Sequence, residues 1–302
     1  MNEVGETGPD ATGPGAAGSD AAKSDAAKLD AGMRRAAELV AGADALLVCA
    51  GAGIGVDSGL PDFRGNEGFW RAYPPYAQLG MGFTDAANPA NFVDDPALAW
   101  GFYGHRLNLY RRTEPHAGFD LLRRWGESTR GGLRVFTSNV DGHFQKAGFA
   151  PEHVAECHGS IHHLQCIEPC TDDTWPADEV EVEVDTDTMR AVSELPRCRN
   201  CGAVARPNIL MFGDFGWVPH DAEERALSTW RRELRRSRLV VVELGAGTAV
   251  PTVRRYAELA SAGDGALIRI NPREPHVRHG HGISLPLGSL EALNAIDGFL
   301  SS

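Results

Sequence analysis

Residues 45–65 read ALLVCAGAGIGVDSGLPDFRG and contain the strongest indication of the fold. The apolar run Ala45–Cys49 is typical of a buried strand, and three closely spaced glycines follow it at once. Backbone N–H groups beside glycines can approach a pyrophosphate closely, so the turn favours nucleotide binding. The ordinary dinucleotide fingerprint fits poorly, because its third glycine falls at Val56 and residues 58–65 contain too many breakers for a long helix. The alternative is a strand–turn link that binds no ligand.

The alternation of strands and helices continues outward from this turn. Short apolar runs predict strands over residues 133–137, 239–244 and 266–270, each ending in polar residues or glycine. Apolar side chains at helical spacing predict helices over residues 96–113, 221–236, 251–262 and 289–300. This alternation indicates an α/β fold with a doubly wound, Rossmann-like parallel sheet. Ligands of such sheets bind at the carboxyl ends of the strands.

The formal net charge of the 302-residue chain is −12, and it is unevenly distributed. Residues 1–30 carry −4 and residues 171–197 carry −7, so the remainder is nearly neutral. Because residues 1–30 have almost no large apolar side chain, we expect them to be disordered. With no run of about 20 apolar residues and no visible secretory signal, the sequence predicts a soluble, cytoplasmic protein without membrane contact. No basic cluster is visible, so direct nucleic-acid binding is not expected.

Four cysteines form two close pairs, Cys166 with Cys170 and Cys198 with Cys201. Two pairs of thiolates suit tetrahedral Zn²⁺ in a closed, structural site. Disulfides are the alternative, but they need an oxidising compartment that nothing in the sequence supports. The acidic residues 171–197 lie between the pairs, where they form a solvated excursion of the module or bind a partner.

Five blocks of the sequence carry a resemblance to a known family. Gly51-Ala-Gly53-Ile54 with Ser58-Gly-Leu-Pro61-Asp62-Phe63-Arg64 resembles the GAG…SGIPDFR signature of sirtuins, the NAD-dependent protein deacylases. Residues 137–142 (TSNVDG), 158–160 (HGS), 206–214 (RPNILMFGD) and 270–271 (IN) resemble further sirtuin motifs in family order. The chain resembles a divergent, bacterial-looking member of this family.

The resemblance implies a role for each matching residue. The catalytic residues would be His158, as general base, with Asn139 and Asp141. The cofactor would be bound by Gly51, Ala52, Gly53, Asp62, Phe63, Arg64, Ser138, Gly245, Gly247 and Asn271. The substrate would be bound by Ile209, Phe212 and Gly213. A histidine with a pKa near ~6.5 can accept a proton at neutral pH. Cys157 beside His158 is not expected to act as a nucleophile, because adjacent strand residues point to opposite faces.

The implied function is a protein-lysine deacylase that transfers the acyl group from a substrate lysine to ADP-ribose and releases nicotinamide. It implies NAD and structural zinc as cofactors. Residues 1–30 would form the tail, residues 31–160 and 206–302 the NAD-binding domain, and residues 161–205 the zinc-binding module with its acidic insert.

The sequence also departs from the family pattern. Gly55 stands where the family has Ser, Ser138 where it has Gln, and Gly247 follows Gly245-Ala where the family has Gly-Thr-Ser. Two alternatives therefore stay open. One is an NAD glycohydrolase or ADP-ribosyltransferase, and the other is a catalytically silent NAD-binding module. The acyl preference and the oligomeric state are not predicted.

Overall fold

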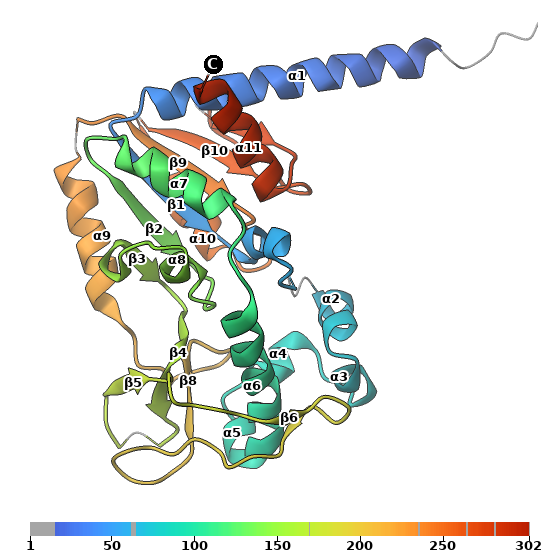
Figure 1. Cartoon of the computed structure of the whole chain (residues 1–302), viewed down its shortest axis with the longest axis vertical. Coiled ribbons are helices and arrows are strands. Elements are labelled where there is room, and N and C mark those ends of the chain that lie inside the picture. Colours follow the sequence, from blue (N-terminus) through green and yellow to red (C-terminus); the bar gives the residue numbers. More distant parts are fainter. Residues whose placement is uncertain are drawn as a thin grey trace, which may run out of the picture.

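A six-stranded parallel sheet forms the centre of the larger part of the molecule (Figure 1). The computed structural model describes residues 16–61, 65–168, 170–234, 236–263, 265–280 and 282–301. The strands run in the order β11 (Gly282–Leu285), β10 (Ala266–Ile270), β9 (Leu239–Leu244), β1 (Ala45–Ala50), β2 (Leu133–Thr137) and β3 (Val154–Glu156). Every neighbouring pair is parallel. The predicted doubly wound α/β fold is confirmed, and the three strands predicted at 133–137, 239–244 and 266–270 have the expected bounds.

Helices cover both faces of this sheet because side chains alternate along each strand. Leu46 and Val48 of β1 point into one apolar core, whereas Leu47 and Cys49 point into another. The first core is closed by α1 (Ala16–Ala41), α7 (Gly118–Glu127) and α11 (Ser289–Leu300), and the second by α9 (Asp221–Glu233) and α10 (Thr252–Ala260). In the part of the chain that the structure describes, no helix has the length and apolar content needed to cross a bilayer.

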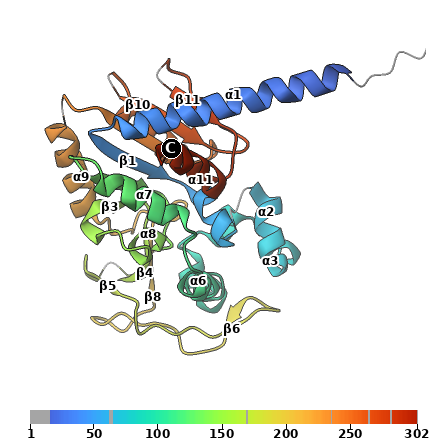
Figure 2. The same cartoon turned by 45° about the horizontal axis from the view of Figure 1, so that its top comes forward.

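The prediction that residues 1–30 are disordered is wrong for residues 16–30, which belong to α1. Residues 1–15 lie outside the described part of the chain. Alanine is the best helix former, so this segment can be helical without a large apolar face. Ion pairs one turn apart, Lys28 with Asp25 and Arg34 with Asp30, add support. Only the later part of α1 packs on α11 and β11, and its start projects beyond the sheet (Figure 2).

A smaller lobe is built from two separate stretches of sequence. One contributes the antiparallel sheet of β5 (Thr174–Pro176), β4 (Gly159–Cys166) and β8 (Ala205–Ile209), with the hairpin β6 (Val184–Asp185) and β7 (Arg190–Ala191). The other contributes α2 (Gly65–Ala72), α3 (Pro74–Gln78), α4 (Phe83–Ala86), α5 (Asn91–Asp94) and α6 (Pro96–Arg112). The indole N–H of Trp100 on α6 donates to the Ala205 carbonyl (2.9 Å) and ties the two stretches together.

These helices share one aromatic core with the cysteine segment. The division expected from sequence placed residues 65–112 with the large sheet, whereas their buried rings pack against Ile161, Leu164 and Trp175. The reason is local composition: α2–α6 are rich in aromatic residues, and those rings contact one another at centroid distances of 5.0–6.4 Å. The smaller lobe is therefore larger than residues 161–205.

Candidate functional site

A cavity of about 900 Å³ lies at the carboxyl ends of the parallel strands. The chain leaves β1 toward β2 on one side, while β9 and β10 lie on the other, so the strand order reverses beside β1. Ligands of doubly wound sheets bind at such a reversal. Ten residues expected at the site line this cavity: Gly51, Ala52, Ser138, Asn139, Asp141, His158, Ile209, Phe212, Gly245 and Gly247. Pockets of this size hold cofactors and drug-sized ligands.

Two glycine turns form the floor of the cavity, and they touch each other. Gly51 follows β1 and Gly245 follows β9; a Cβ on Gly51 would lie 2.8 Å from the Ala246 Cα. Gly245 has a φ of +61°, and a Cβ there would overlap the backbone of Gly53. The Gly53 N–H donates to the Gly245 carbonyl (3.1 Å). Gly53 thus supports the turn from behind, whereas Gly51 and Gly245 present bare backbone to the cavity.

The segment after β2 places Asn139 and Asp141 in the cavity wall. The Asn139 amide donates to the Gly51 carbonyl (3.2 Å), so it joins the second block to the glycine turn. An Asp141 carboxylate oxygen accepts from the His143 backbone N–H (3.0 Å), and the His162 ring donates to the Asp141 carbonyl (2.9 Å). His162, to which the sequence analysis assigned no role, therefore fixes the position of the Asp141 backbone.

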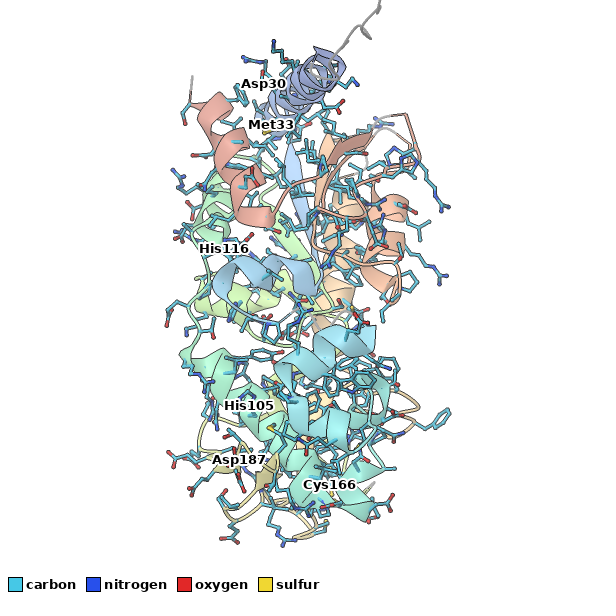
Figure 3. All side chains as sticks on the ribbon, turned by 90° about the vertical axis from the view of Figure 1, so that its right-hand side faces the viewer. Asp30, Met33, His105, His116, Cys166 and Asp187 are labelled. Carbon is cyan, nitrogen blue, oxygen red and sulfur yellow. The ribbon has the colours of Figure 1, made fainter. Side chains whose placement is uncertain are left out.

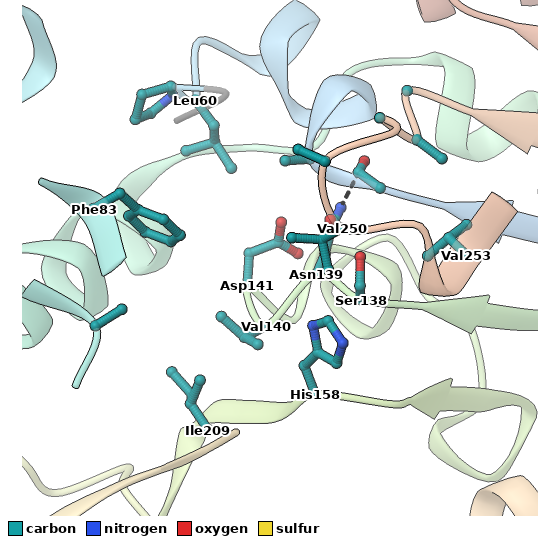
Figure 4. A pocket seen from close by; sticks show the side chains of 18 of the residues that line it. Leu60, Phe83, Ser138, Asn139, Val140, Asp141, His158, Ile209, Val250 and Val253 are labelled. Atoms are coloured by element: carbon teal, nitrogen blue, oxygen red, sulfur yellow. Dashed lines mark hydrogen bonds between the residues drawn. The ribbon is translucent and has the colours of Figure 1, made fainter. Parts of the chain in front are cut away.

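His158 faces Asp141 and Ser138 across the same space (Figure 4). It lies in the turn after β3, two residues past Glu156, and burial lowers the pKa of its imidazole, so the ring is neutral at neutral pH. A neutral imidazole can accept a proton, as a general base must. Burial raises the pKa of the neighbouring Cys157 thiol to about 12, which keeps it protonated and a poor nucleophile.

Glu156, two residues before His158, carries the most perturbed carboxyl near the site. Glu156 is half-buried, and desolvation raises the pKa of its carboxyl to about 8, with the charge of Asp141 acting in the same direction. At neutral pH this side chain is therefore largely protonated. No sequence motif pointed to Glu156, because this property depends on the tertiary surroundings of the carboxyl.

The opposite wall is the end of β8 and the loop that follows it. Ile209, Leu210, Met211 and Phe212 line the cavity, and the Phe83 ring meets the Phe212 ring edge-on at a centroid distance of 5.8 Å. The Phe212 N–H donates to the Ala87 carbonyl (3.0 Å), which links the loop to the helical part of the smaller lobe.

The four paired cysteines converge at the other end of the molecule, where Figure 3 labels Cys166. Their sulfur atoms all lie within 4.8 Å of one another, and Cys166–Cys201 and Cys170–Cys198 approach to 3.5 and 3.6 Å. Sulfurs bound 2.3 Å from a tetrahedral zinc lie about 3.8 Å apart, whereas a disulfide is about 2.05 Å long. The donor set fits structural zinc, which would crosslink the cysteine segment.

Comparisons with known proteins agree with this geometry. The model of the Sir2 family matches residues 51–245. The chain belongs to this family. It is 30% identical over 238 residues to "NAD-dependent protein deacylase 1" of Archaeoglobus fulgidus, covering 78% of this chain and 84% of that protein. It is 29% identical over 233 residues to a protein deacylase of Aquifex aeolicus, covering 76% of this chain and 84% of that protein.

Solved structures give the same result for the fold. A crystal structure of a Sir2 homolog–NAD complex matches with a TM-score of 0.68 and 25% identity, covering 88% of this chain and 93% of that chain. A second Sir2 enzyme structure matches with a TM-score of 0.64 and 26% identity, over 90% of this chain and 98% of that chain.

Among the described residues, Asn271 and Gly213 were expected at the site but do not line the cavity. Asp62, Phe63 and Arg64 lie outside the described residues. Asn271 is buried behind the wall, where its amide donates to the Ala246 carbonyl (2.9 Å) and its oxygen accepts from the backbone N–H groups of Arg273 and Glu274. Gly213 sits beside Phe212 with a φ of +70°, which shapes the loop.

Other cavity residues were missed by sequence reasoning. Tyr103, Arg106 and Tyr110 lie on one face of α6, and the buried Arg106 guanidinium donates to the Tyr110 hydroxyl (2.9 and 3.1 Å). The sequence did contain a signal for this cluster: Arg106 lies three residues after Tyr103 and four before Tyr110, a spacing that places all three on one helix face. Thr248 and Glu274 also line the cavity, and the Glu274 carboxylate accepts from the hydroxyl and the N–H of Thr248.

Proposed function

We propose that this Sir2 family member is an NAD-dependent protein-lysine deacylase that transfers the acyl group of a substrate lysine to ADP-ribose. The observation that carries the proposal is the convergence of His158, Asn139 and Asp141 in one cavity, between the glycine turns and the β8 wall. The names of the relatives, which are NAD-dependent protein deacylases, support it.

The residues present fit NAD. The cavity of about 900 Å³ is large enough for a dinucleotide, and its floor is bare backbone at Gly51 and Gly245. When bound, NAD supplies the ribose carbon that accepts the acyl oxygen after nicotinamide departs. Gly51, Ala52, Gly245 and Gly247 would face the phosphates, and Ser138 the ribose edge. The loop of Asp62, Phe63 and Arg64 is proposed to complete this site.

The wall residues are proposed to hold the reacting groups in position. Asp141, fixed by the His143 N–H and the His162 ring, would hold the nicotinamide amide. Asn139, fixed to the Gly51 carbonyl, would orient the neighbouring ribose. Neutral His158 would accept a proton from a ribose hydroxyl, because its lowered pKa leaves the imidazole unprotonated at neutral pH.

The acyl-lysine is proposed to enter along the β8 wall. Ile209 and Phe212 are apolar and line the cavity, so they suit the aliphatic stem of a lysine, and Gly213 shapes the turn beside them. An extended peptide can add to an exposed strand end through main-chain hydrogen bonds. The proposed partner is therefore an acylated lysine in an extended segment of a protein substrate. Six cysteines without disulfides support a cytoplasmic location.

A second candidate is NAD hydrolysis or ADP-ribosylation in the same cavity, and Gly55 favours it. A Cβ on Gly55 would lie 3.2 Å from the Leu60 side chain, so the serine of the family pattern would crowd that residue. Gly55 therefore packs its bare backbone against Leu60 and carries no hydroxyl at this position.

The test compares wild type with His158→Ala on an acetyl-lysine peptide and NAD. The proposal expects loss of deacylation by at least about 10²-fold, the usual contribution of a general base. A matched control is His163→Ala on β4, which is outside the cavity lining and should keep wild-type turnover. Wild-type rates in His158→Ala would contradict the role of His158.

A further inference from the structure

Phe215 is the most exposed large apolar side chain of the described residues. Its relative exposure is 102%, which is that of a residue in an extended chain. Single exposed apolar residues are common, but a bare phenyl ring three residues after Phe212, which lines the cavity, is a candidate contact for a ligand.

The turn that carries Phe215 is rigidly held. Asp214 accepts two hydrogen bonds from the Arg206 guanidinium (2.8 and 2.9 Å), and the two side chains are 1% and 2% exposed. Its carboxylate also accepts from the backbone N–H groups of Met211 and Gly216 (3.2 Å each). Gln165 donates to the Gly216 carbonyl (2.7 Å), which fixes the far side of the turn. The ring is therefore held in solvent by a preorganised backbone.

Two apolar side chains at the rim of the cavity precede this ring in the same loop. Leu210 and Phe212 line the cavity and remain 38% and 39% exposed, so both reach its rim. Phe215 follows Phe212 by three residues, a span of at most about 10 Å along an extended chain. A peptide whose acyl-lysine enters beside Phe212 would thus bring its neighbouring residues to the ring.

We propose that Phe215, with the exposed edges of Leu210 and Phe212, binds an apolar side chain within about three positions of the acyl-lysine in the protein substrate. This proposal rests on the proposed function for the identity of the substrate. A rigid aromatic side chain gives contact area at little cost in conformational entropy, as in binding hot spots. The contact would make the protein selective for sequence around the modified lysine.

The experiment measures affinity, so that it does not depend on turnover. Fluorescently labelled acetyl-lysine peptides that carry leucine or glycine at one position between −3 and +3 are titrated with the full chain without NAD. We expect leucine to bind about tenfold more tightly than glycine in at least one position, which corresponds to about 1.4 kcal/mol. Phe215→Ala should reduce this ratio to below about threefold, and Phe215→Leu should keep most of it.

The matched control is Leu259→Ala, because Leu259 on α10 is also an exposed large apolar residue (73%) but does not line the cavity. It should leave the leucine-to-glycine ratio unchanged. Circular dichroism checks that each variant folds, and an exposed site makes folding of Phe215→Ala the expected result.

Two results would overturn the proposal: no leucine preference at any position, or the same preference in Phe215→Ala. If Phe215→Ala abolishes self-association in sedimentation and leaves the ratio unchanged, a second copy of this chain covers the ring instead, and the proposal is wrong. Adding NAD and measuring deacylation distinguishes the proposed deacylase function from the proposed Phe215 contact. A Phe215-dependent preference without deacylation would contradict the proposed function and leave this inference standing.

Discussion

Asp214→Ala should destabilise the protein strongly, because it removes one half of a buried ion pair. Arg206 and Asp214 make two hydrogen bonds of 2.8 and 2.9 Å with side chains that are almost fully buried. Breaking such a pair costs about 3–5 kcal/mol, since the remaining charge stays buried without its partner. Two backbone donors, at Met211 and Gly216, lose their acceptor as well.

We therefore expect the free energy of unfolding to fall by about 3–5 kcal/mol in urea titrations, and the KM for an acyl-lysine peptide to rise because the β8 wall loses its support. Glu127→Gln is the control: Glu127 pairs with Arg123 on the surface, and its loss should cost less than about 1 kcal/mol. Arg206→Met with Asp214→Leu should regain most of the stability. A loss below about 1 kcal/mol in Asp214→Ala would show that this ion pair does not stabilise the fold as expected.

Three further predictions concern His158, Glu156 and the cysteines. Because burial lowers the pKa of His158, the acid limb of the kcat/KM profile should lie below pH ~6.5, and a limb above pH 7 would contradict this. Burial raises the pKa of Glu156 from 4.5 to about 8, so between these pH values the folded protein keeps a proton that the unfolded chain has lost. The free energy of unfolding therefore falls as the pH rises through this window. Glu156→Gln should therefore stabilise the protein more at pH 8 than at pH 5 in urea titrations, unlike the exposed Glu152→Gln, and equal effects at both pH values would refute the assignment. Metal analysis should find one zinc ion per chain. Cys198→Ser should lose the zinc and destabilise the smaller lobe, whereas Cys157→Ser should keep the zinc. Zinc bound to Cys198→Ser at the wild-type level would contradict the proposed site.

The sheet could be predicted from sequence because its strands are short apolar runs that end in glycine or polar residues. The β2, β9 and β10 strands match their predicted bounds, since both faces of a parallel strand are buried and the whole run must be apolar. The ends of helices were predicted less accurately. The helix expected over residues 221–236 ends at Glu233, three residues early, and the sequence carries no stop signal there that could have predicted this end.

The smaller lobe could not be predicted in the same way. Its core joins residues 65–112 to the cysteine segment, and short helices of four to eight residues carry no clear periodic signal. Residues 16–30 were misjudged for a related reason, since low hydrophobicity predicts disorder although alanine itself favours a helix.

The site was predictable where a motif contributes it and unpredictable where tertiary packing does. Asn139, Asp141 and His158 were named from sequence and lie in one cavity. Tyr103 and Arg106 come from a helix that the motifs do not include, and the role of His162 depends on a contact across 21 residues. Asn271 was expected to face the ligand, but it joins two loops behind the wall.

Product identification by mass spectrometry tests the central proposal most directly. Wild-type protein is incubated with NAD and an acetyl-lysine peptide, and every product is identified and quantified. We expect nicotinamide, deacetylated peptide and O-acetyl-ADP-ribose in equal amounts. Nicotinamide with free ADP-ribose or ADP-ribosylated protein, and an unchanged peptide, would contradict it.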